Sequence, residues 1–211
     1  ALALSGHGLN IALVDSQLPD FAKLQNQDAR SIALNDASKQ IFTALSIWDE
    51  LKVQAQGIDE IHVSDKGRMG FTRFKAFDYG LSHLGYVVGI ADLLSCLYSH
   101  LEKAQDICCL APMNVTKVSP QASSWILETQ DNQRLSCNLL LAADGTLSPI
   151  RKQLNIPIKQ DIYPNTAIVC NISTKEITKP TAYERFTSAG PLALLPTKNN
   201  QYVLIWTVDK D

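Results

Sequence analysis

The sequence lacks the features that point to several common classes of protein. Its 19 Lys and Arg residues are balanced by 21 Asp and Glu residues, so no basic excess suggests binding to nucleic acid. No apolar run is long enough to span a bilayer, and no nucleophile elbow is present. The four histidines show no metal-ligand spacing, so we predict no metal site. Cysteines are odd in number and without C-x-x-C spacing, which is typical of reduced thiols in a cytoplasmic protein.

What is present is the composition of a globular protein. The chain has 211 residues, of which 45% are apolar and 19% charged, with a formal net charge of −2. This length suffices for a sizeable core in one or two domains.

The amino-terminal residues resemble the second half of a dinucleotide-binding βαβ unit. Residues 1–8 predict the end of a helix followed by a glycine turn, and residues 10–15 predict a buried strand that ends in Asp15. An acid at this point of a βαβ unit binds ribose hydroxyls. The preceding strand and its G-x-G-x-x-G loop are not in the sequence, so we expect a fragment of a longer protein.

A second nucleotide-like signal lies in "LLLAADGTLSPIRK", residues 139–152. The apolar run 139–143 predicts a strand covered on both faces, which would place Asp144 at its carboxyl end and Gly145 in a tight turn. Thr146 or Ser148 can cap a short helix that starts at Pro149. The alternative is an ordinary strand-turn-helix with a solvated Asp-Gly turn.

Periodicity predicts the remaining elements. Residues 36–54 and 91–104 are amphipathic helices, the first capped by Asn35 or Asp36, and residues 60–74 are two strands around a turn at Lys66-Gly67. From Tyr163 onward the pattern is that of longer strands. Alternation places Tyr183, Arg185 and Thr187 on one face of a strand and Glu184 and Phe186 on the other. For residues 68–74 we expect a strand with its apolar face in the core.

Several motifs together resemble the flavoprotein aromatic hydroxylases of the para-hydroxybenzoate hydroxylase class. "AADGTLSPIR" is similar to the family's DG motif, with Ala142 in place of the usual first glycine. The segments "ARSIALN", "IHVSDKGRMGF", "LGYVV" and "ERFTSAGPLALLP" are similar to the ubiquinone-biosynthesis branch of this family. The resemblance covers nearly the whole chain in order.

The resemblance implies an α/β fold: an incomplete Rossmann-like FAD-binding domain (residues 1–60 and 85–158) and part of a β-sheet substrate domain (residues 61–84 and 159–211). It implies an FAD-dependent aromatic-ring monooxygenase that uses NAD(P)H and O2, with the fragment alone inactive. The cofactor carries the chemistry, so we predict no catalytic side chain. The implied cofactor-binding residues are Asp15, Arg30, Asp144 and Gly145. Ala193 and Leu194, in "PLALLP", are the candidate substrate-binding residues; the alternative for this segment is a core strand bounded by prolines.

The resemblance also implies a partner and a location. The substrate is a polyprenyl phenol, so a cytoplasmic enzyme would meet the surface of the inner membrane or a complex of ubiquinone-biosynthesis proteins, and residues 68–74 are a candidate contact. Two other functions stay open: a related flavoprotein oxidoreductase, such as an isoprenoid reductase or an oxidase, and a non-catalytic scaffold.

Overall fold

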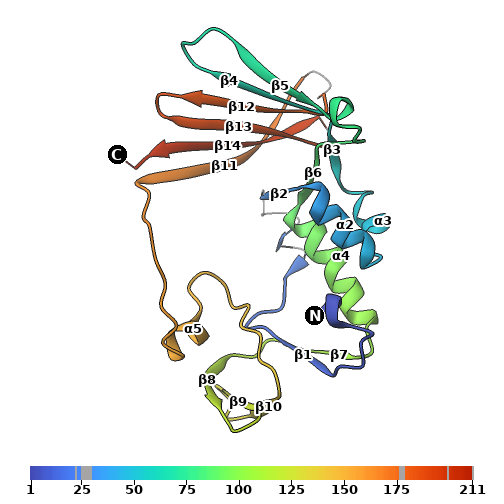
Figure 1. Cartoon of the computed structure of the whole chain (residues 1–211), viewed down its shortest axis with the longest axis vertical. Helices are drawn as coiled ribbons and strands as arrows, with labels where there is room; N and C mark the ends of the chain where they lie inside the picture. Colours follow the sequence, from blue (N-terminus) through green and yellow to red (C-terminus); the bar gives the residue numbers. More distant parts are fainter. Residues whose placement is uncertain (22, 25–29, 176–178, 199, 211) are drawn as a thin grey trace. The chain divides into compact units, whose positions relative to one another are not determined.

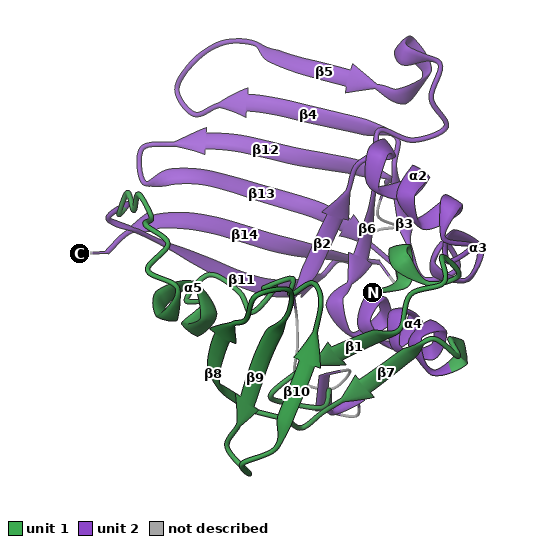
Figure 2. Cartoon of the chain, turned by 60° about the horizontal axis from the view of Figure 1, so that its bottom comes forward, with its two compact units in different colours: residues 1–19, 103–162 green, residues 20–102, 163–211 purple. Residues whose placement is uncertain are grey.

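The computed structural model describes residues 1–210 except 22, 25–29, 176–178 and 199. The chain forms two compact units, each built from two separate stretches of sequence (Figures 1 and 2). Unit 1 contains residues 1–19 and 103–162, and unit 2 contains residues 20–102 and 163–211. Helices and strands occur in both, which confirms the α/β class; the functional domain boundaries stay a prediction.

Unit 1 contains a two-stranded parallel sheet and a three-stranded antiparallel sheet. Its elements are η1 (Leu2–Leu4), β1 (Ile11–Val14), β7 (Ile107–Leu110), β8 (Val115–Pro120), β9 (Trp125–Thr129), β10 (Arg134–Cys137) and α5 (Pro149–Gln153). β1 pairs with β7, and the order of the antiparallel sheet is β10-β9-β8. Val118, Leu127 and Ile150 form a buried cluster, so the short helix α5 packs its apolar side on this sheet.

One prediction for unit 1 is wrong, and another is confirmed only in part. Residues 139–143 form no strand, and the side chains of Leu139 and Leu141 are 70% and 64% exposed. A strand exists only through ladder hydrogen bonds, and no strand in the described part of the chain pairs with this segment. The amino-terminal helix is a single 3-10 turn, after which Gly6 and Gly8 adopt positive φ of 78° and 73°.

Unit 2 is built around a six-stranded sheet. In spatial order its strands are β11 (Asn165–Ser173), β14 (Gln201–Asp209), β13 (Gly190–Thr197), β12 (Thr181–Thr187), β4 (Glu60–Asp65) and β5 (Phe71–Lys75). All neighbouring pairs are antiparallel except β12 and β4 (Figure 2). Gly190 begins β13 with φ of 122°, and a Cβ atom there would lie 2.2 Å from the carbonyl oxygen of Thr207. Only glycine fits this start of the β13 strand.

A smaller antiparallel sheet, the helices α2, α3 and α4 and the 3-10 turn η2 also belong to unit 2. The elements are β2 (Ser31–Leu34), β6 (Gly85–Gly89), β3 (Gln56–Ile58), α2 (Asp36–Ala44), α3 (Trp48–Leu51), α4 (Ile90–Lys103) and η2 (Ala76–Tyr79). The Trp48 ring packs edge-on against the Tyr86 ring of β6, with 4.7 Å between centroids. A buried cluster of Ile58, Val87 and Ala182, with Ile61 and Leu195 packed against it, joins this sheet to the six-stranded one.

The helix predicted over residues 36–54 is two helices. Asn35 caps α2 as predicted, its side chain accepting a hydrogen bond of 2.9 Å from the backbone N–H of Ser38. The helix stops because Ser46 adopts a positive φ of 57°, a conformation that a right-handed helix cannot contain. The break lets Trp48 and Leu51 enter the core while Ile41 stays 59% exposed.

The hairpin of β4 and β5 forms as predicted, with Lys66 and Gly67 in its turn. The prediction that the apolar face of residues 68–74 lies in the core is wrong, however. Every residue of β5 is exposed, including Phe71 at 62% and Phe74 at 40%, because β5 is the edge strand of the sheet. None of the described helices is both long enough and apolar enough to cross a membrane.

Candidate functional site

Asp15 lies where the parallel pair β1 and β7 ends. Its backbone N–H donates to the carbonyl of Leu110 at 3.2 Å, and its own carbonyl accepts from the N–H of Met113 at 2.7 Å. These bonds fix the backbone, while the exposed carboxylate makes an Asx turn by accepting a 3.0 Å hydrogen bond from the N–H of Gln17. The result is a rigidly anchored carboxylate beyond the carboxyl end of a parallel strand, the place where open α/β folds bind ligands.

Asp144 organises the start of α5. Its Oδ1 accepts a hydrogen bond of 2.5 Å from the Ser148 hydroxyl, and its Oδ2 accepts one of 3.1 Å from the backbone N–H of Ile150. The Ser148 Oγ in turn accepts from the N–H of Arg151 at 2.9 Å, which makes Ser148 the N-cap, as predicted, with Pro149 at the first helical position. The carboxylate and the hydroxyl therefore satisfy two of the N–H groups that a helix start leaves unpaired.

These contacts tune the charge of Asp144. Burial raises the pKa of the Asp144 carboxyl, but the hydrogen bonds from Ser148 and Ile150, assisted by the charge of Arg151, outweigh it and hold the pKa below its ordinary value. The group is thus an anion at neutral pH, held in a fixed orientation. Of the ordinary strand-turn-helix alternative, the helix cap is present and the strand is not, and the exposed Asp144 carboxylate is held by two hydrogen bonds.

Gly145 and Arg30 are the other predicted cofactor residues. Gly145 follows Asp144 with φ of 89°, and a Cβ atom there would meet nothing within 4 Å. The backbone is therefore approachable at this point. Arg30 directly precedes β2 in unit 2, with an exposed side chain, and its carbonyl accepts a 3.1 Å hydrogen bond from the N–H of Ile90. The structure keeps Asp15, Asp144 and Gly145 in unit 1 and Arg30 in unit 2.

The two predicted substrate residues lie next to each other on β13 and so point to opposite faces of the six-stranded sheet. Ala193 is paired with Glu184 of β12, and Leu194 is paired with Tyr183. Ala193 shares its face with Leu195, whose side chain packs on the cluster of Ile58 and Val87. Only one of the two residues can therefore contact a ligand on a given face. Both are half-buried in a central strand, so the core-strand alternative for "PLALLP" also remains open.

Glu184 is a candidate to which sequence reasoning assigned a face but no role. The strand register confirms the predicted alternation, because Tyr183 pairs with Leu194 and Glu184 with Ala193. Glu184 is half-buried, and burial raises the pKa of its carboxyl above the ordinary value. The signal in the sequence was a charged residue between apolar neighbours on an otherwise apolar strand face.

A group of possible metal ligands forms where sequence spacing suggested none. Glu50, Cys96 and His100 each offer a ligand atom, and these atoms lie within 4.8 Å of one another. Cys96 and His100 are one turn apart on α4, and His100 Nδ1 is already 2.9 Å from the Cys96 carbonyl oxygen. Glu50 is exposed at the end of α3, with its carboxylate 3.8 Å from the same nitrogen. We interpret the group as a contact between two helices.

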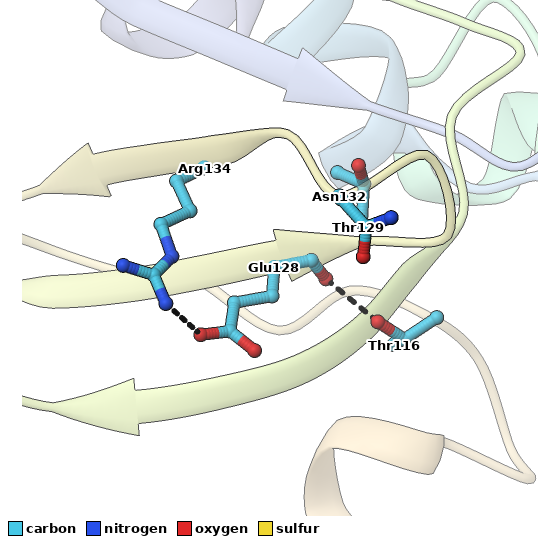
Figure 3. A pocket seen from close by; sticks show the side chains of 5 residues that line it. All are labelled: Thr116, Glu128, Thr129, Asn132 and Arg134. Carbon is cyan, nitrogen blue, oxygen red and sulfur yellow. Dashed lines mark hydrogen bonds and ion pairs between the residues drawn. The ribbon is translucent and has the colours of Figure 1, made fainter.

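A shallow polar pocket lies on the β8–β10 sheet, lined by Thr116, Glu128, Thr129, Asn132 and Arg134 (Figure 3). The Arg134 guanidinium points at the Glu128 carboxylate and lies 3.2 Å from it, so the two charges satisfy each other. None of the predicted site residues lines this pocket, and we assign it no function.

Comparison with known proteins gives consistent matches. The family described as "FAD binding domain" matches residues 1–211. "Ubiquinone hydroxylase UbiL" of Rhodospirillum rubrum is 28% identical over 211 residues, which cover 100% of this chain and 49% of that protein. "3-demethoxyubiquinol 3-hydroxylase" of Escherichia coli is 23% identical, covering 98% of this chain and 53% of that protein. This chain thus spans about half the length of these relatives.

Solved structures share the fold at low sequence identity. PqsL of Pseudomonas aeruginosa, in complex with 2-aminobenzoylacetate, superposes with a TM-score of 0.82 at 14% identity, covering 99% of this chain and 57% of that one. HpxO of Klebsiella pneumoniae, complexed with FAD and uric acid, gives a TM-score of 0.73 at 14% identity, covering 98% of this chain and 58% of that one. At this identity the similarity concerns the fold.

Proposed function

Because the chain belongs to the FAD binding domain family, which matches it from end to end, we propose that the protein is an FAD-dependent aromatic-ring monooxygenase. In this proposal it hydroxylates a polyprenyl phenol in ubiquinone biosynthesis and uses NAD(P)H and O2. The observation that carries the proposal is the family match over residues 1–211, together with relatives named as ubiquinone hydroxylases.

The residues present fit a flavin nucleotide. Asp15 offers an exposed carboxylate at the end of a parallel strand, which suits ribose hydroxyls, and the open backbone at Gly145 allows close approach of a ligand. Asp144 fixes this loop through its bonds to Ser148 and Ile150. In this proposal Arg30, an exposed cationic residue of unit 2, is a further contact of the nucleotide, as the family resemblance implies. When bound, FAD supplies hydride acceptance and oxygen transfer; the protein binds, orients and excludes water.

For the member of the family, we propose a protein like 2-octaprenyl-6-methoxyphenol hydroxylase (UbiH). The segment His62–Gly67, in the hairpin of β4 and β5, carries this resemblance most specifically. The six-stranded sheet supports the assignment of a substrate lobe, because an apolar sheet face is suited to an aromatic ring. Ala193 is the better of the two predicted substrate residues, since it shares the face on which Glu184 lies.

The test is direct. The full-length protein is purified, its flavin absorbance is recorded, and NAD(P)H oxidation and O2 uptake are followed with a short-chain prenyl phenol. We expect a yellow protein, oxidation stimulated by the phenol, and a product that carries one oxygen atom from isotopically labelled O2. An isoprenoid reductase would add hydrogen to its substrate without consuming O2. A scaffold would be colourless and bind no FAD.

We further propose that the turn and edge strand at residues 68–74 contact the membrane or a partner protein. Met69 and Phe71 are strongly exposed, which suits contact with a lipid surface, and the neighbouring Arg68 and Arg73 form ion pairs of 3.3 Å and 3.2 Å with Asp65 and Glu60. Co-sedimentation of the full-length protein with vesicles of phosphatidylglycerol tests this. Loss of co-sedimentation in Phe71→Ser but not in Leu147→Ser, an exposed apolar control in unit 1, is the expected result. If both variants or neither sediment with the vesicles, the contact lies elsewhere.

A further inference from the structure

The face of the six-stranded sheet that carries Glu184 changes character along its length. At one end Ala182 is only 4% exposed, and Leu195 and Ile61 pack there against the cluster of Ile58 and Val87. Two residues further along β12, at Glu184, the face is no longer covered by that cluster. Beyond Glu184, Phe186 is 50% exposed. Glu184 therefore lies at the border between the covered and the open half of one sheet face.

The immediate neighbours of Glu184 are apolar. Its two cross-strand partners are Val63 on β4 and Ala193 on β13, and Ala193 is in turn opposite Ile205 on β14. Side chains that face each other across a ladder point to the same side of the sheet, so these residues surround the carboxylate on its own face. Ala193 is small, and it is half-buried like Val63 and Ile205. A flat apolar group can lie on the Val63, Ala193 and Ile205 side chains.

Among the described residues the Glu184 carboxylate has no hydrogen-bond or ion-pair partner. In the part of the chain that the structure describes, no hydrogen-bond donor and no cation contacts Glu184, and burial alone raises its pKa. A half-buried anion without a donor costs free energy, which a ligand that brings an O–H group can recover. The site thus suits an apolar ring that carries a hydroxyl group.

We propose that Glu184 accepts a hydrogen bond from the hydroxyl of the phenolic substrate and takes its proton during the reaction. This inference rests on the proposed function. In the proton transfer the phenolic O–H bond breaks and a bond forms between the hydrogen and a carboxylate oxygen of Glu184. The electron pair stays on the phenolic oxygen, which makes the ring richer in electrons and so more reactive toward an electrophilic oxygen atom. Glu184 is then a catalytic residue that both positions and activates the ring.

The test uses the full-length, FAD-loaded protein and 4-nitrophenol, a phenol whose ionised form is yellow. The variant is Glu184→Gln, which keeps the shape of the side chain and removes its charge. The control is Arg185→Gln, which removes a charge from the next residue, exposed on the opposite face of β12. Binding is followed by the change in flavin fluorescence, and ionisation of the bound phenol by its colour.

We expect Glu184→Gln to weaken the binding of neutral 4-nitrophenol by roughly tenfold or more, as for a lost hydrogen bond to a charged group, with Arg185→Gln unchanged. The difference between wild type and Glu184→Gln should disappear as the pH falls through the raised pKa of Glu184, because protonation removes the acceptor charge. Bound 4-nitrophenol should also turn partly yellow at a lower pH in the wild type than in Glu184→Gln, since only the carboxylate can take up the phenolic proton and share it with the phenolic oxygen.

Equal affinity and equal ionisation of 4-nitrophenol in wild type and Glu184→Gln would overturn the inference. A lower melting temperature of Glu184→Gln with unchanged phenol affinity would also overturn it, because such a result would mean that the carboxylate interacts with another group of the protein. The proposed function survives either result if the wild type still binds FAD and phenol stimulates its NAD(P)H oxidation. Failure of the wild type to bind FAD or any phenol would instead refute both.

Discussion

Replacing Asp144 by alanine tests whether this carboxylate stabilises the loop between Asp144 and the start of α5 or only contacts a ligand. The side chain makes two charge-assisted hydrogen bonds, to the Ser148 hydroxyl at 2.5 Å and to the Ile150 N–H at 3.1 Å. Fully desolvated bonds of this kind contribute about 1.5–3 kcal/mol each. The Asp144 carboxylate is exposed, so solvent screening reduces the pair to about 1–2 kcal/mol, the range of a helix cap.

The expected effect is local to unit 1 and visible in two assays. Thermal unfolding should show a melting temperature lower by about 2–8 °C, at roughly 2–4 °C per kcal/mol for a chain of this length. Hydrogen exchange should accelerate at the amides of Ile150 and Arg151, because one loses its acceptor and the other loses the fixed Ser148 hydroxyl. Asp144→Asn, which keeps a side-chain acceptor, should give a smaller loss.

A double-mutant cycle separates the contributions of the two side chains. Ser148→Ala should cost about 1 kcal/mol, and the double variant should lose less than the sum by about 0.5–1 kcal/mol, because one hydrogen bond is shared. In the FAD-loaded protein both single variants should weaken FAD binding, since both loosen the loop.

The pH dependence follows from the lowered pKa of Asp144. A carboxyl whose folded pKa lies below its unfolded value of about 3.8 contributes stability above that value. The contribution is lost as the pH falls through the folded pKa, so the difference in melting temperature between wild type and Asp144→Ala should vanish at acidic pH. Unchanged melting and exchange in Asp144→Ala, with FAD affinity alone reduced, would refute the structural reasoning and leave Asp144 as a direct ligand of the nucleotide.

Two further predictions concern backbone and charge. Gly190→Ala should destabilise the sheet of unit 2 by about 2–4 kcal/mol in chemical denaturation, because the new Cβ meets the Thr207 carbonyl oxygen and the positive φ adds its own cost. The control Gly145→Ala also has a positive φ but lies in open space, so it should cost only about 1–2 kcal/mol. Equal losses of stability in the two variants would contradict the proposed clash with Thr207. The pKa of Asp106 is lowered by hydrogen bonds from the Ser5 hydroxyl and the Gly6 N–H, so the Gly6 amide resonance should shift as the pH falls through that pKa, and a resonance that follows only the global unfolding would contradict this.

The amino-acid sequence by itself determined the features that depend on a few neighbouring residues. The cap at Asn35, the cap and proline start at Ser148 and Pro149, and the alternation that separates Tyr183 from Glu184 all formed as predicted. Each rests on backbone geometry and hydrogen bonds within about one turn or one strand pair, so the residue types alone specify them.

Tertiary structure decided what depends on distant partners. Residues 139–143 have the composition of a buried strand, but a strand needs a ladder partner and the described chain gives them none. Phe71 has the pattern of a core residue, but β5 is an edge strand and its side chain is exposed. The apolar surroundings of the Glu184 carboxylate come from Val63, which is distant in sequence, and from Ala193, which lies across the β12–β13 hairpin. Both residues become its neighbours only through strand pairing. Local periodicity does not encode which strands become neighbours, because that choice depends on burial summed over the whole unit.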